Sequence, residues 1–320
     1  DEDGCAAIVH SWFEGQKKAL LADFVVGTID QLLLAALKQK HVMLRHLGLA
    51  NKVVIIDECH AYDAYMNVYL AMALRWLGAY KVPVIVLSAT LPVKKRQILI
   101  DAYLNVDASE KTADDPLGRG IIESESTTHW ATCCEYPQIT WTDGNTVNQK
   151  TIVNDNIPRT VYLVNLCDDT LADKLDDLLS DGGCAGVIVN TVKRAQEVAR
   201  VLRQRFGQKI VHLLHSRFIA PDRAKIEREL LQELGKPGKD VHRPYKRIIV
   251  GTQVLEQSLD IDFDVLFTDI CPMDLLLQRI GRLHRHNRIR LHKLQNACCF
   301  VLGISEDDFE CSTKAIYGEY

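Results

Sequence analysis

The stretch VVIIDECH, residues 53–60, places the carboxylates of Asp57 and Glu58 directly after four apolar, β-branched residues. A run of this kind is typical of a short strand that is buried on both faces of a parallel sheet. Similar runs recur along the chain and alternate with longer amphipathic stretches, as in strands joined by helical crossovers. The sequence therefore predicts an α/β fold in which parallel sheets are flanked by helices.

The predicted strands fall into two groups along the chain. They are residues 24–27, 53–56 and 82–87 in the first group, and residues 186–189, 209–214, 247–250, 265–268 and 298–302 in the second. Apolar residues recur at helical spacing over residues 64–79 and 192–206, and a third helix is predicted over residues 273–286. Two separate α/β lobes account for this grouping.

The two groups are separated by a polar, turn-rich segment from about residue 105 to 156. Within it, Asp143-Gly144-Asn145 lies between strand-like runs and predicts a β-hairpin. The chain has 320 residues, enough for two domains of ordinary size. We assign residues 1–135 to the first lobe, 136–165 to a β-rich connection, 166–305 to the second lobe, and 306–320 to a tail or the start of a following segment.

The composition argues against a membrane protein and against bulk attraction to polyanions. Lys and Arg number 38 and Asp and Glu number 42, so any contact with nucleic acid must be local. The ten cysteines are scattered without a CxxC spacing, which favours buried thiols of a reducing cytoplasm over disulfides or a zinc site. The apolar runs are shorter than the ~20 residues of a membrane span, and the chain begins with acidic residues. We expect a cytoplasmic protein of a prokaryote.

The carboxylates that follow the 53–56 strand are candidates for nucleotide chemistry, because open α/β sheets bind ligands at the carboxyl ends of their strands. Asp57 suits a Mg²⁺ ion held through water, and Glu58 suits orientation and deprotonation of an attacking water. The alternative is an acidic strand end that merely faces solvent.

Hydroxyl groups follow two further predicted strands of the first lobe. Ser88 and Thr90 lie beyond residues 82–87 and are candidates to couple the nucleotide site to the nucleic-acid side. Thr28 and Gln31 have the spacing of a capping box at a helix start, where free amides hold a backbone phosphate. A simple helix cap is the alternative.

The second lobe carries candidate contacts for nucleic acid and for the nucleotide. Thr252 and Gln253 follow the 247–250 strand, where Thr252 can meet a phosphate of the nucleic acid, and Asp260 is an acceptor for a ribose or a coupling contact. Arg282 and Arg285 are three residues apart on the predicted helix, so they share a face and can neutralise a γ-phosphate. The alternative is a basic face in solvent.

Two weaker candidates complete the set. Ser216 and Arg217 follow the 209–214 strand and add to the nucleic-acid face, unless they simply lead into a helix. Trp12 and Phe13 could stack on a base, although an aromatic pair beside an apolar stretch is more often part of a core.

DECH at residues 57–60, SAT at 88–90, the Gly251-Thr252-Gln253 segment and QRIGRLHR at 278–285 follow one another in this order. Together they resemble the superfamily 2 helicases. Residues 12 to about 302 look more closely like the CRISPR-associated helicase-nuclease of type I systems, the effector recruited by Cascade. That similarity is carried by residues 12–13, 19–21, 26–33, 57–66, 87–92, 215–218 and 256–264.

The resemblance implies two RecA-like lobes that drive an ATP- and Mg²⁺-dependent translocase on single-stranded DNA, unwinding target DNA in antiviral defence. It also implies an N-terminal HD domain that cuts DNA. Carried over by motif, it assigns catalytic roles to Asp57, Glu58, His60, Gln278, Arg282 and Arg285, and nucleotide contacts to Asp260 and the same acidic and arginine pairs. The acidic pair and the arginine pair would then confront one another over a single nucleotide.

The chain departs from this family pattern in two places. It contains no G-x-x-x-x-G-K-[ST] loop and no His-Asp dipeptide. Apart from these two departures, the chain does not begin with Met. We therefore expect a portion of a longer protein, with an incomplete first lobe, that alone neither binds ATP tightly nor cuts DNA. The competing hypotheses are an ordinary DExH-box RNA helicase and a non-catalytic docking module.

Overall fold

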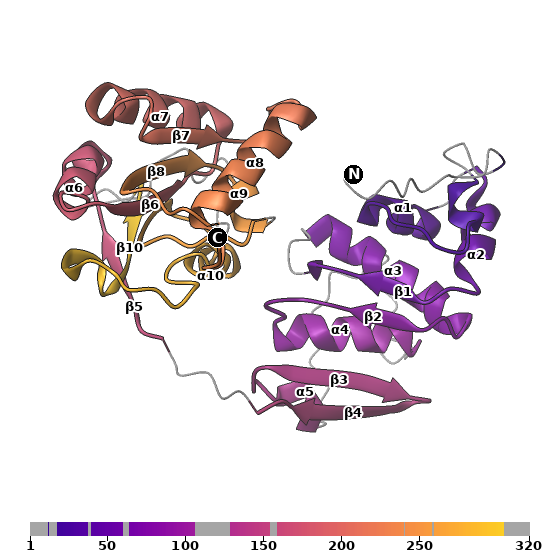
Figure 1. Ribbon diagram of the computed structural model, residues 1–320. Coiled ribbons are helices and arrows are strands. Elements are labelled where there is room, and N and C mark those ends of the chain that lie inside the picture. The colour runs from indigo at the N-terminus through magenta and orange to yellow at the C-terminus, as the bar shows by residue number, and fades with distance from the viewer. Residues whose placement is uncertain are drawn as a thin grey trace. The chain divides into compact units, whose positions relative to one another are not determined.

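The structure is a computed structural model that describes residues 12, 18–37, 40–59, 64–105, 129–153, 159–239, 241–257 and 259–303. These residues belong to two compact units, Asp1–Asn156 and Ile157–Tyr320 (Figure 1). Each unit has a parallel sheet and a hydrophobic core of its own. The predicted α/β class with two lobes is confirmed.

The first unit contains a parallel pair of strands, β1 (Val54–Ile56) and β2 (Val84–Val86). They are joined by α3 (Ala64–Ala79), and α4 (Val93–Tyr103) follows β2. The predicted helix over residues 64–79 is confirmed, and its apolar face is buried through Leu70, Ala73, Leu74 and Leu77. This packing seats the carboxyl ends of β1 and β2 above one core.

Short helices precede the sheet. They are η2 (Ala19–Leu21), α1 (Ile29–Leu33), η3 (Leu34–Ala36) and α2 (Val42–Leu49). The strand predicted over residues 24–27 is absent, which corrects our interpretation of this run. Phe24 and Val26 are almost fully exposed, and among the residues that the structure describes this run has no strand neighbour. An apolar run becomes a strand only where a second strand is available to pair with it.

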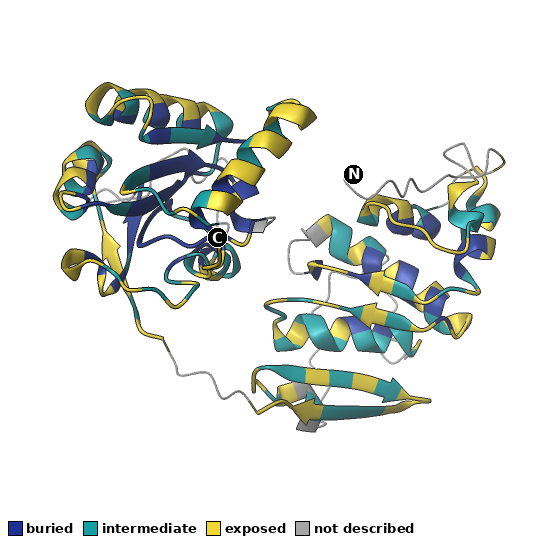
Figure 2. Cartoon of the chain, viewed as in Figure 1, coloured by how far each residue is buried: buried dark blue, intermediate teal, exposed yellow. Residues whose placement is uncertain are grey.

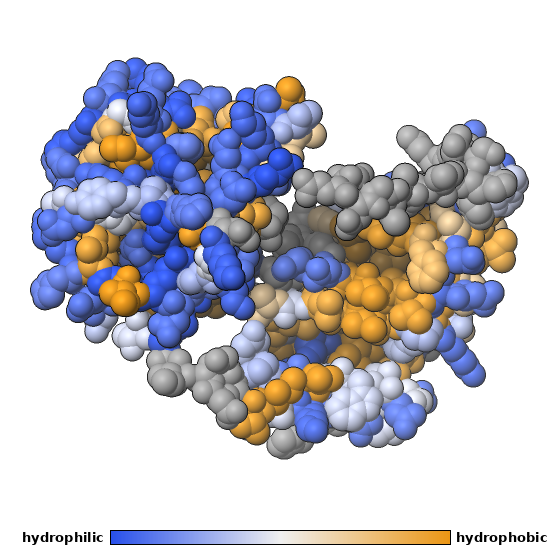
Figure 3. All heavy atoms as spheres, viewed as in Figure 1, coloured by the Kyte–Doolittle hydropathy of each residue, from blue (hydrophilic) through white to orange (hydrophobic). Residues whose placement is uncertain are grey.

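One face of the β1–β2 sheet is uncovered within the described part of the chain. Val54, Ile56, Val84 and Val86 pack with the core of the unit, whereas the alternate residues Ile55 and Ile85, which pair in register, are 63% and 46% exposed. Apolar side chains gather on the surface in the region of these strands (Figure 3). Parallel sheets are normally covered on both faces.

The turn-rich segment contains the predicted hairpin. α5 (His129–Thr132) leads to β3 (Gln138–Asp143), which pairs antiparallel with β4 (Thr146–Thr151). Gly144 in the two-residue turn has φ 57°, a left-handed conformation that glycine adopts without steric cost. Exposed and half-buried residues alternate along β3, so one face of the hairpin is partly covered (Figure 2). This confirms the turn at residues 143–145.

The second unit is built on a six-stranded parallel sheet in the order β5-β10-β9-β6-β8-β7. The strands are β5 (Val161–Asn165), β6 (Gly183–Ile188), β7 (Val211–Leu214), β8 (Lys246–Gly251), β9 (Val265–Asp269) and β10 (Ala297–Leu302). All five strands predicted for the second lobe are present, with ends shifted by a few residues. Most of the central strands are buried (Figure 2).

Helices cover both faces of this sheet. α6 (Leu171–Leu178) and α7 (Val192–Phe206) pack on one side, and α8 (Ala220–Leu234), α9 (Val254–Gln257) and α10 (Met273–Ile280) contribute to the core on the other side. The predicted helix over residues 192–206 is confirmed. Because all six strands are parallel, their carboxyl ends lie at the same end of the sheet, which is where open α/β sheets bind ligands.

The strand β5 lies within residues that we assigned to the inter-lobe connection. It pairs with β10 at the edge of the second sheet, so the second unit includes residues before 166. Most of β5 is exposed. Its edge position explains why its sequence does not distinguish it from a connecting segment.

The helix predicted over residues 273–286 is shorter in the structure, because α10 ends at Ile280. Beyond it, the chain turns to pair with the segment before β9. Phe263 N donates to Arg282 O at 2.9 Å, and His284 N donates to Phe263 O at 3.0 Å. This pairing replaces the helical hydrogen bonds and corrects the prediction that Arg282 and Arg285 share a helix face.

Candidate functional site

The two acidic residues of the DECH stretch lie directly beyond β1. Asp57 and Glu58 are exposed, and Glu58 N donates to Asp57 Oδ1 at 2.9 Å. Glu58 has φ 54°, in the left-handed region that residues other than glycine seldom adopt. Backbone strain of this kind is concentrated at functional sites. His60, which we also predicted, lies outside the described residues.

The SAT stretch lies beside the DECH stretch. Leu87 N donates to Ile56 O at 2.8 Å and Cys59 N donates to Leu87 O at 3.3 Å, so the strand ladder continues past the ends of β1 and β2. Ser88 Oγ donates to the carbonyl of Thr90 at 2.8 Å. The structure therefore brings together the two predicted motifs of the first unit at one end of its sheet.

The cysteine of the DECH stretch is buried at this junction. Burial raises the pKa of the Cys59 thiol above its usual value, and a hydrogen bond with the Ser88 side chain opposes that rise. The thiol is therefore neutral at physiological pH. Among the described residues, all cysteines are free thiols, three of them buried.

The capping box predicted for residues 28–31 does not form. Thr28 is the N-cap residue of α1, but its side chain makes no capping hydrogen bond. The Gln31 side chain instead accepts a hydrogen bond from Arg45 Nη1 at 3.0 Å. A tertiary partner for Gln31 thus replaces the local contact that the spacing predicts, and the nucleic-acid role of the pair stays a prediction.

The predicted nucleic-acid contacts of the second unit lie together beyond the carboxyl ends of two neighbouring strands. β7 and β8 are neighbours, and Thr252 N donates to Leu214 O at 3.3 Å where both strands end. Thr252 is buried, whereas Gln253, Ser216 and Arg217 are exposed beyond these strand ends. An exposed guanidinium, hydroxyl and amide at one edge can contact a phosphate backbone.

The two predicted arginine residues lie in the turn after α10. Arg282 Nε donates to Glu256 O at 3.2 Å. Arg285 pairs with Asp260, which His286 Nε2 also approaches at 3.4 Å. Partial burial raises the pKa of Asp260, but the hydrogen bond from Arg285 and the charge interactions with the nearby basic side chains together more than offset this, so its pKa is below the usual value. The structure therefore pairs two residues that we predicted as separate nucleotide contacts.

A buried polar network at the centre of the second unit escaped sequence analysis. Arg279 is fully buried, and its Nε donates to Glu256 Oε1 at 2.7 Å. Its guanidinium also donates to Thr268 Oγ1 at 2.7 Å and to Asn190 Oδ1 at 3.0 Å. The available signal was its position on α10, three residues after the buried Leu276, where an apolar residue is expected.

A second ion-pair network extends this one towards α7. Arg194 Nε donates to Asp269 Oδ1 at 2.9 Å, and the same guanidinium pairs with Asp168. Asp269 also accepts from Asn190 N at 2.9 Å, so it is held from two sides. Burial raises the pKa of Asp269, and Arg194 opposes this rise. These contacts connect the carboxyl ends of neighbouring strands, at the end of the sheet where the predicted site residues lie.

Gln278, which we predicted as catalytic, lies half-buried on α10. Its amide nitrogen Nε2 is buried and has no hydrogen-bond partner within the part of the chain that the structure describes. A buried amide of this kind favours a ligand or a partner group at the site. The catalytic role of Gln278 stays a prediction.

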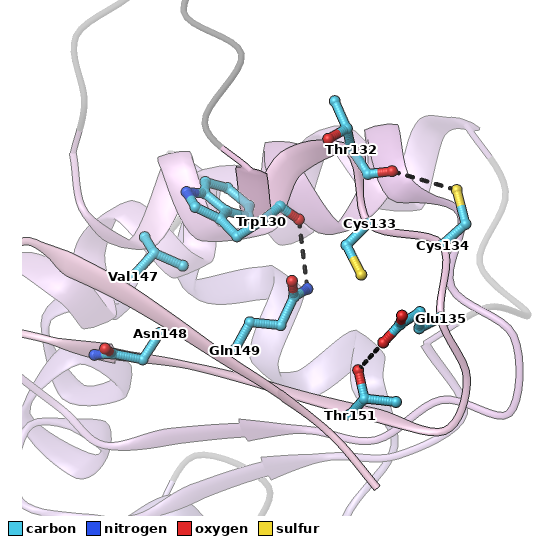
Figure 4. A pocket seen from close by; sticks show the side chains of 9 residues that line it. All are labelled: Trp130, Thr132, Cys133, Cys134, Glu135, Val147, Asn148, Gln149 and Thr151. Carbon is cyan, nitrogen blue, oxygen red and sulfur yellow. Dashed lines mark hydrogen bonds between the residues drawn. The ribbon is translucent and has the colours of Figure 1, made fainter. Parts of the chain in front are cut away.

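Two cavities of the first unit lie around the hairpin. One, of about 650 Å³, lies between α5 and β4 and is lined by Trp130, Cys133 and Gln149, among others (Figure 4). Gln149 Nε2 donates across it to Trp130 O at 3.4 Å. The other, of about 640 Å³, lies between β2, α4 and β3 and reaches Ser88. The first cavity contains none of the predicted site residues.

Groups of three or more metal-ligating side chains are absent from the described residues. Within the same residues, no helix has the length and apolar character needed to cross a membrane.

Comparisons with known proteins place these features in context. A family model described as the C-terminal part of the CRISPR-associated nuclease/helicase Cas3 matches residues 181–288. The chain is 48% identical to the CRISPR-associated nuclease/helicase Cas3 of Streptococcus thermophilus, over 100% of this chain and 33% of that protein. It is 37% identical to the CRISPR-associated endonuclease/helicase Cas3 of Escherichia coli K12, over 86% of this chain and 30% of that protein.

Solved structures show the same similarity. The crystal structure of T. fusca Cas3-ATP matches with a TM-score of 0.82 at 36% identity, over 96% of this chain and 36% of that one. A chain of a CRISPR RNA-guided surveillance complex, pre-nicking, matches with a TM-score of 0.78 at 35% identity, over 95% of this chain and 38% of that one. The chain spans about a third of the length of the curated relatives that it matches.

Proposed function

We propose, from the premise that this chain belongs to the Cas3 family of CRISPR-associated nuclease/helicases, that it forms ATP-hydrolysing motor lobes of a type I interference effector. The motor would translocate on single-stranded DNA after recruitment by Cascade, in the cytoplasm of a prokaryote. The observation that carries the proposal is the junction beyond β1 and β2, where Asp57 and Glu58 lie exposed beside the SAT stretch.

Asp57 and Glu58 would have different roles in ATP hydrolysis. Bound ATP would supply the phosphate bond that is cleaved, and Mg²⁺ would supply positive charge that neutralises the phosphate oxygens. Asp57 would hold the ion through its water shell, as its exposed position allows. Glu58 would orient the attacking water and accept its proton, because the strained backbone directs this side chain from a fixed point at the strand end.

Arg282 and Arg285 would neutralise charge on the transferring phosphate. A guanidinium suits this role because it remains charged and presents several donors in one plane. The contact of Arg282 with the Glu256 carbonyl, and the pairing of Arg285 with Asp260, hold both side chains in defined positions at rest. His60, Gln278 and Asp260 complete the proposed nucleotide contacts.

The edge beyond β7 and β8 would contact the DNA backbone through Thr252, Gln253, Ser216 and Arg217. The exposure of three of these residues at adjoining strand ends supports this assignment. Thr28 and Gln31 would add contacts from the first unit, and Ser88 and Thr90 would couple the two kinds of site.

We further propose that a polypeptide segment outside these residues supplies the phosphate-binding loop and the HD nuclease. The printed sequence contains no G-x-x-x-x-G-K-[ST] stretch, and the relatives are about three times as long as the part that matches. The uncovered face of the β1–β2 sheet supports the need for a further layer. This chain alone would bind ATP weakly and cut no DNA.

The test uses the full-length protein with its Cascade partner and compares Glu58→Gln with Glu197→Gln, an exposed glutamate of α7. We expect ATP hydrolysis to be stimulated more by single-stranded DNA than by RNA. Removal of the general base should lower the stimulated rate by about 100-fold or more, whereas Glu197→Gln should retain it. A Glu58→Gln protein that hydrolyses ATP at the normal rate would contradict the proposal, and stimulation by RNA alone would favour an RNA helicase.

A further inference from the structure

Cys59 is held at three of its groups, although none of them carries the proposed chemistry. Its amide donates to Leu87 O at 3.3 Å, its thiol is hydrogen-bonded to the Ser88 side chain, and its carbonyl accepts from Lys95 Nζ at 2.8 Å. We call these three contacts the Cys59 clamp. The clamp ties the residue after Glu58 to β2, to the SAT stretch and to α4 at once.

The turn before the clamp needs such support. Glu58 has φ 54°, and a residue with a side chain pays a steric cost in this region. Strained residues of this kind persist only where neighbouring contacts determine the backbone. The amide of Glu58 makes a local hydrogen bond to Asp57 Oδ1, whereas the next residue makes contacts with more distant parts of the unit. These contacts belong to the Cys59 clamp.

Lys95 is the member of the Cys59 clamp whose place in its own helix is electrostatically unfavourable. It lies in the first turn of α4, which begins at Val93 and has no acidic residue in that turn. Cations near a helix N-terminus are repelled by the helix dipole. The repulsion between the helix dipole and the half-buried Lys95 is offset by the charge-assisted hydrogen bond from Lys95 to the Cys59 carbonyl. The acidic pair, Asp57 and Glu58, also offsets it, and the same pair acts on the Cys59 thiol.

We propose that Lys95 is a positioning residue for ATP hydrolysis, which holds Glu58 in its catalytic orientation through the Cys59 clamp. The inference rests on the proposed function and extends it to a residue outside the DECH and SAT stretches. Lys95 lies in the first turn of α4, which begins three residues after the SAT stretch, so it connects that part of the unit with the backbone next to Glu58. Loss of the ammonium group should let the strained turn relax, without removing any group that contacts the nucleotide.

The experiment measures kcat and KM for ATP in the DNA-stimulated reaction of the full-length protein. Lys95→Met keeps the aliphatic stem and removes the donor, and Lys95→Arg restores a charged donor. Lys94→Met is the matched control, because Lys94 is an exposed lysine in the same helical turn. Each change is also made in the Glu58→Gln background, and thermal unfolding verifies that every variant is folded.

We expect Lys95→Met to lower kcat by about 10- to 100-fold, the usual effect of a small misplacement of a catalytic group, with little change in KM. Lys95→Arg should recover most of the rate, and Lys94→Met should match the wild type. In the Glu58→Gln background, Lys95→Met should lower the residual rate no further, because its effect passes through Glu58. If Lys95→Met does not fold, Lys95→Gln replaces it in the same measurements.

Three results would overturn the inference. They are an unchanged kcat in Lys95→Met, an equal loss in Lys94→Met, and an equal loss from Lys95→Met with and without Glu58. Failure of the proposed function is distinguishable, because the wild type would then show no DNA-stimulated hydrolysis or Glu58→Gln would be fully active. If Glu58→Gln is inactive and Lys95→Met hydrolyses ATP at the normal rate, the role of Lys95 is rejected and the proposed function is not.

Discussion

Replacement of Arg279 by Met should destabilise the second unit far more than a surface change of the same kind. Met preserves much of the side-chain volume and removes the guanidinium that contacts Glu256, Thr268 and Asn190. Both charged side chains of the Arg279–Glu256 pair are fully buried. The change therefore leaves a buried carboxylate without its cation.

Breaking a buried pair from one side costs about 3–5 kcal/mol, because the remaining charge is neither hydrated nor compensated. The oxygens of Thr268 and Asn190 would also lose a donor. A cost of ~4 kcal/mol corresponds to roughly a 10³-fold rise in the fraction of molecules in which this part of the sheet is open. The unit would thus lose a large part of its stability.

The loss of stability caused by Arg279→Met should depend on pH in a defined direction. Burial raises the pKa of Glu256 above its usual value, even though Arg279 opposes the rise. The folded state then holds the proton more tightly than the unfolded state, so stability falls as the pH rises from the unfolded pKa through the raised folded pKa. Without Arg279 the folded pKa should rise further. The destabilisation by Arg279→Met should therefore be smallest at acidic pH, where Glu256 is protonated.

Hydrogen exchange of the β6 and β9 backbone amides measures this local stability in the complete chain, since both strands lie in the centre of the sheet. Arg200→Met is the matched control, because Arg200 is exposed on α7 of the same unit. We expect much faster exchange in Arg279→Met and unchanged exchange in the control. A loss below about 1 kcal/mol at neutral pH would refute the buried-charge argument.

Two further changes test other features. Arg285→Ala should lower DNA-stimulated ATP hydrolysis in the full-length protein by about 10³-fold or more if Arg285 acts on the phosphate. Arg205→Ala, which removes another exposed arginine paired with carboxylates, should not, and equal rates in both would favour a non-catalytic docking module. Gly78→Ala should destabilise the first unit by about 1–3 kcal/mol, because its Cβ would lie 1.8 Å from Tyr103 O. Gly27→Ala has room for the methyl group, so similar amide exchange in the two variants would contradict this packing argument.

Sequence patterns predicted best where local chemistry and burial agree. The helices at residues 64–79 and 192–206 have the predicted bounds, because apolar residues recur at helical spacing on one face of each helix, and that face packs on the core of its own unit. The run at residues 24–27 misled the same reasoning, since apolar character alone does not provide a strand neighbour. The helix over residues 273–286 was too long because a contact with Phe263, distant in sequence, ends it after Ile280.

The candidate site shows the same division. The apolar runs before the DECH and SAT stretches were sufficient to predict that each stretch follows a strand, and the structure showed that the two strands are neighbours. The pairing of Arg285 with Asp260 and the contact of Lys95 with Cys59 were not predictable, because their partners are 25 and 36 residues apart and no periodicity connects them. Arg279 was hidden within a basic stretch that otherwise indicates a solvated surface.

By itself, the sequence determined the α/β class, the order of the strands along the chain and the residue types at each strand end, because these depend on composition and short-range periodicity. Only the tertiary structure decided which strands pair, where α10 stops and which charges neutralise one another. Those outcomes depend on distances between segments that are remote in the chain, and hydrogen bonding and burial select among arrangements that local propensity leaves equal.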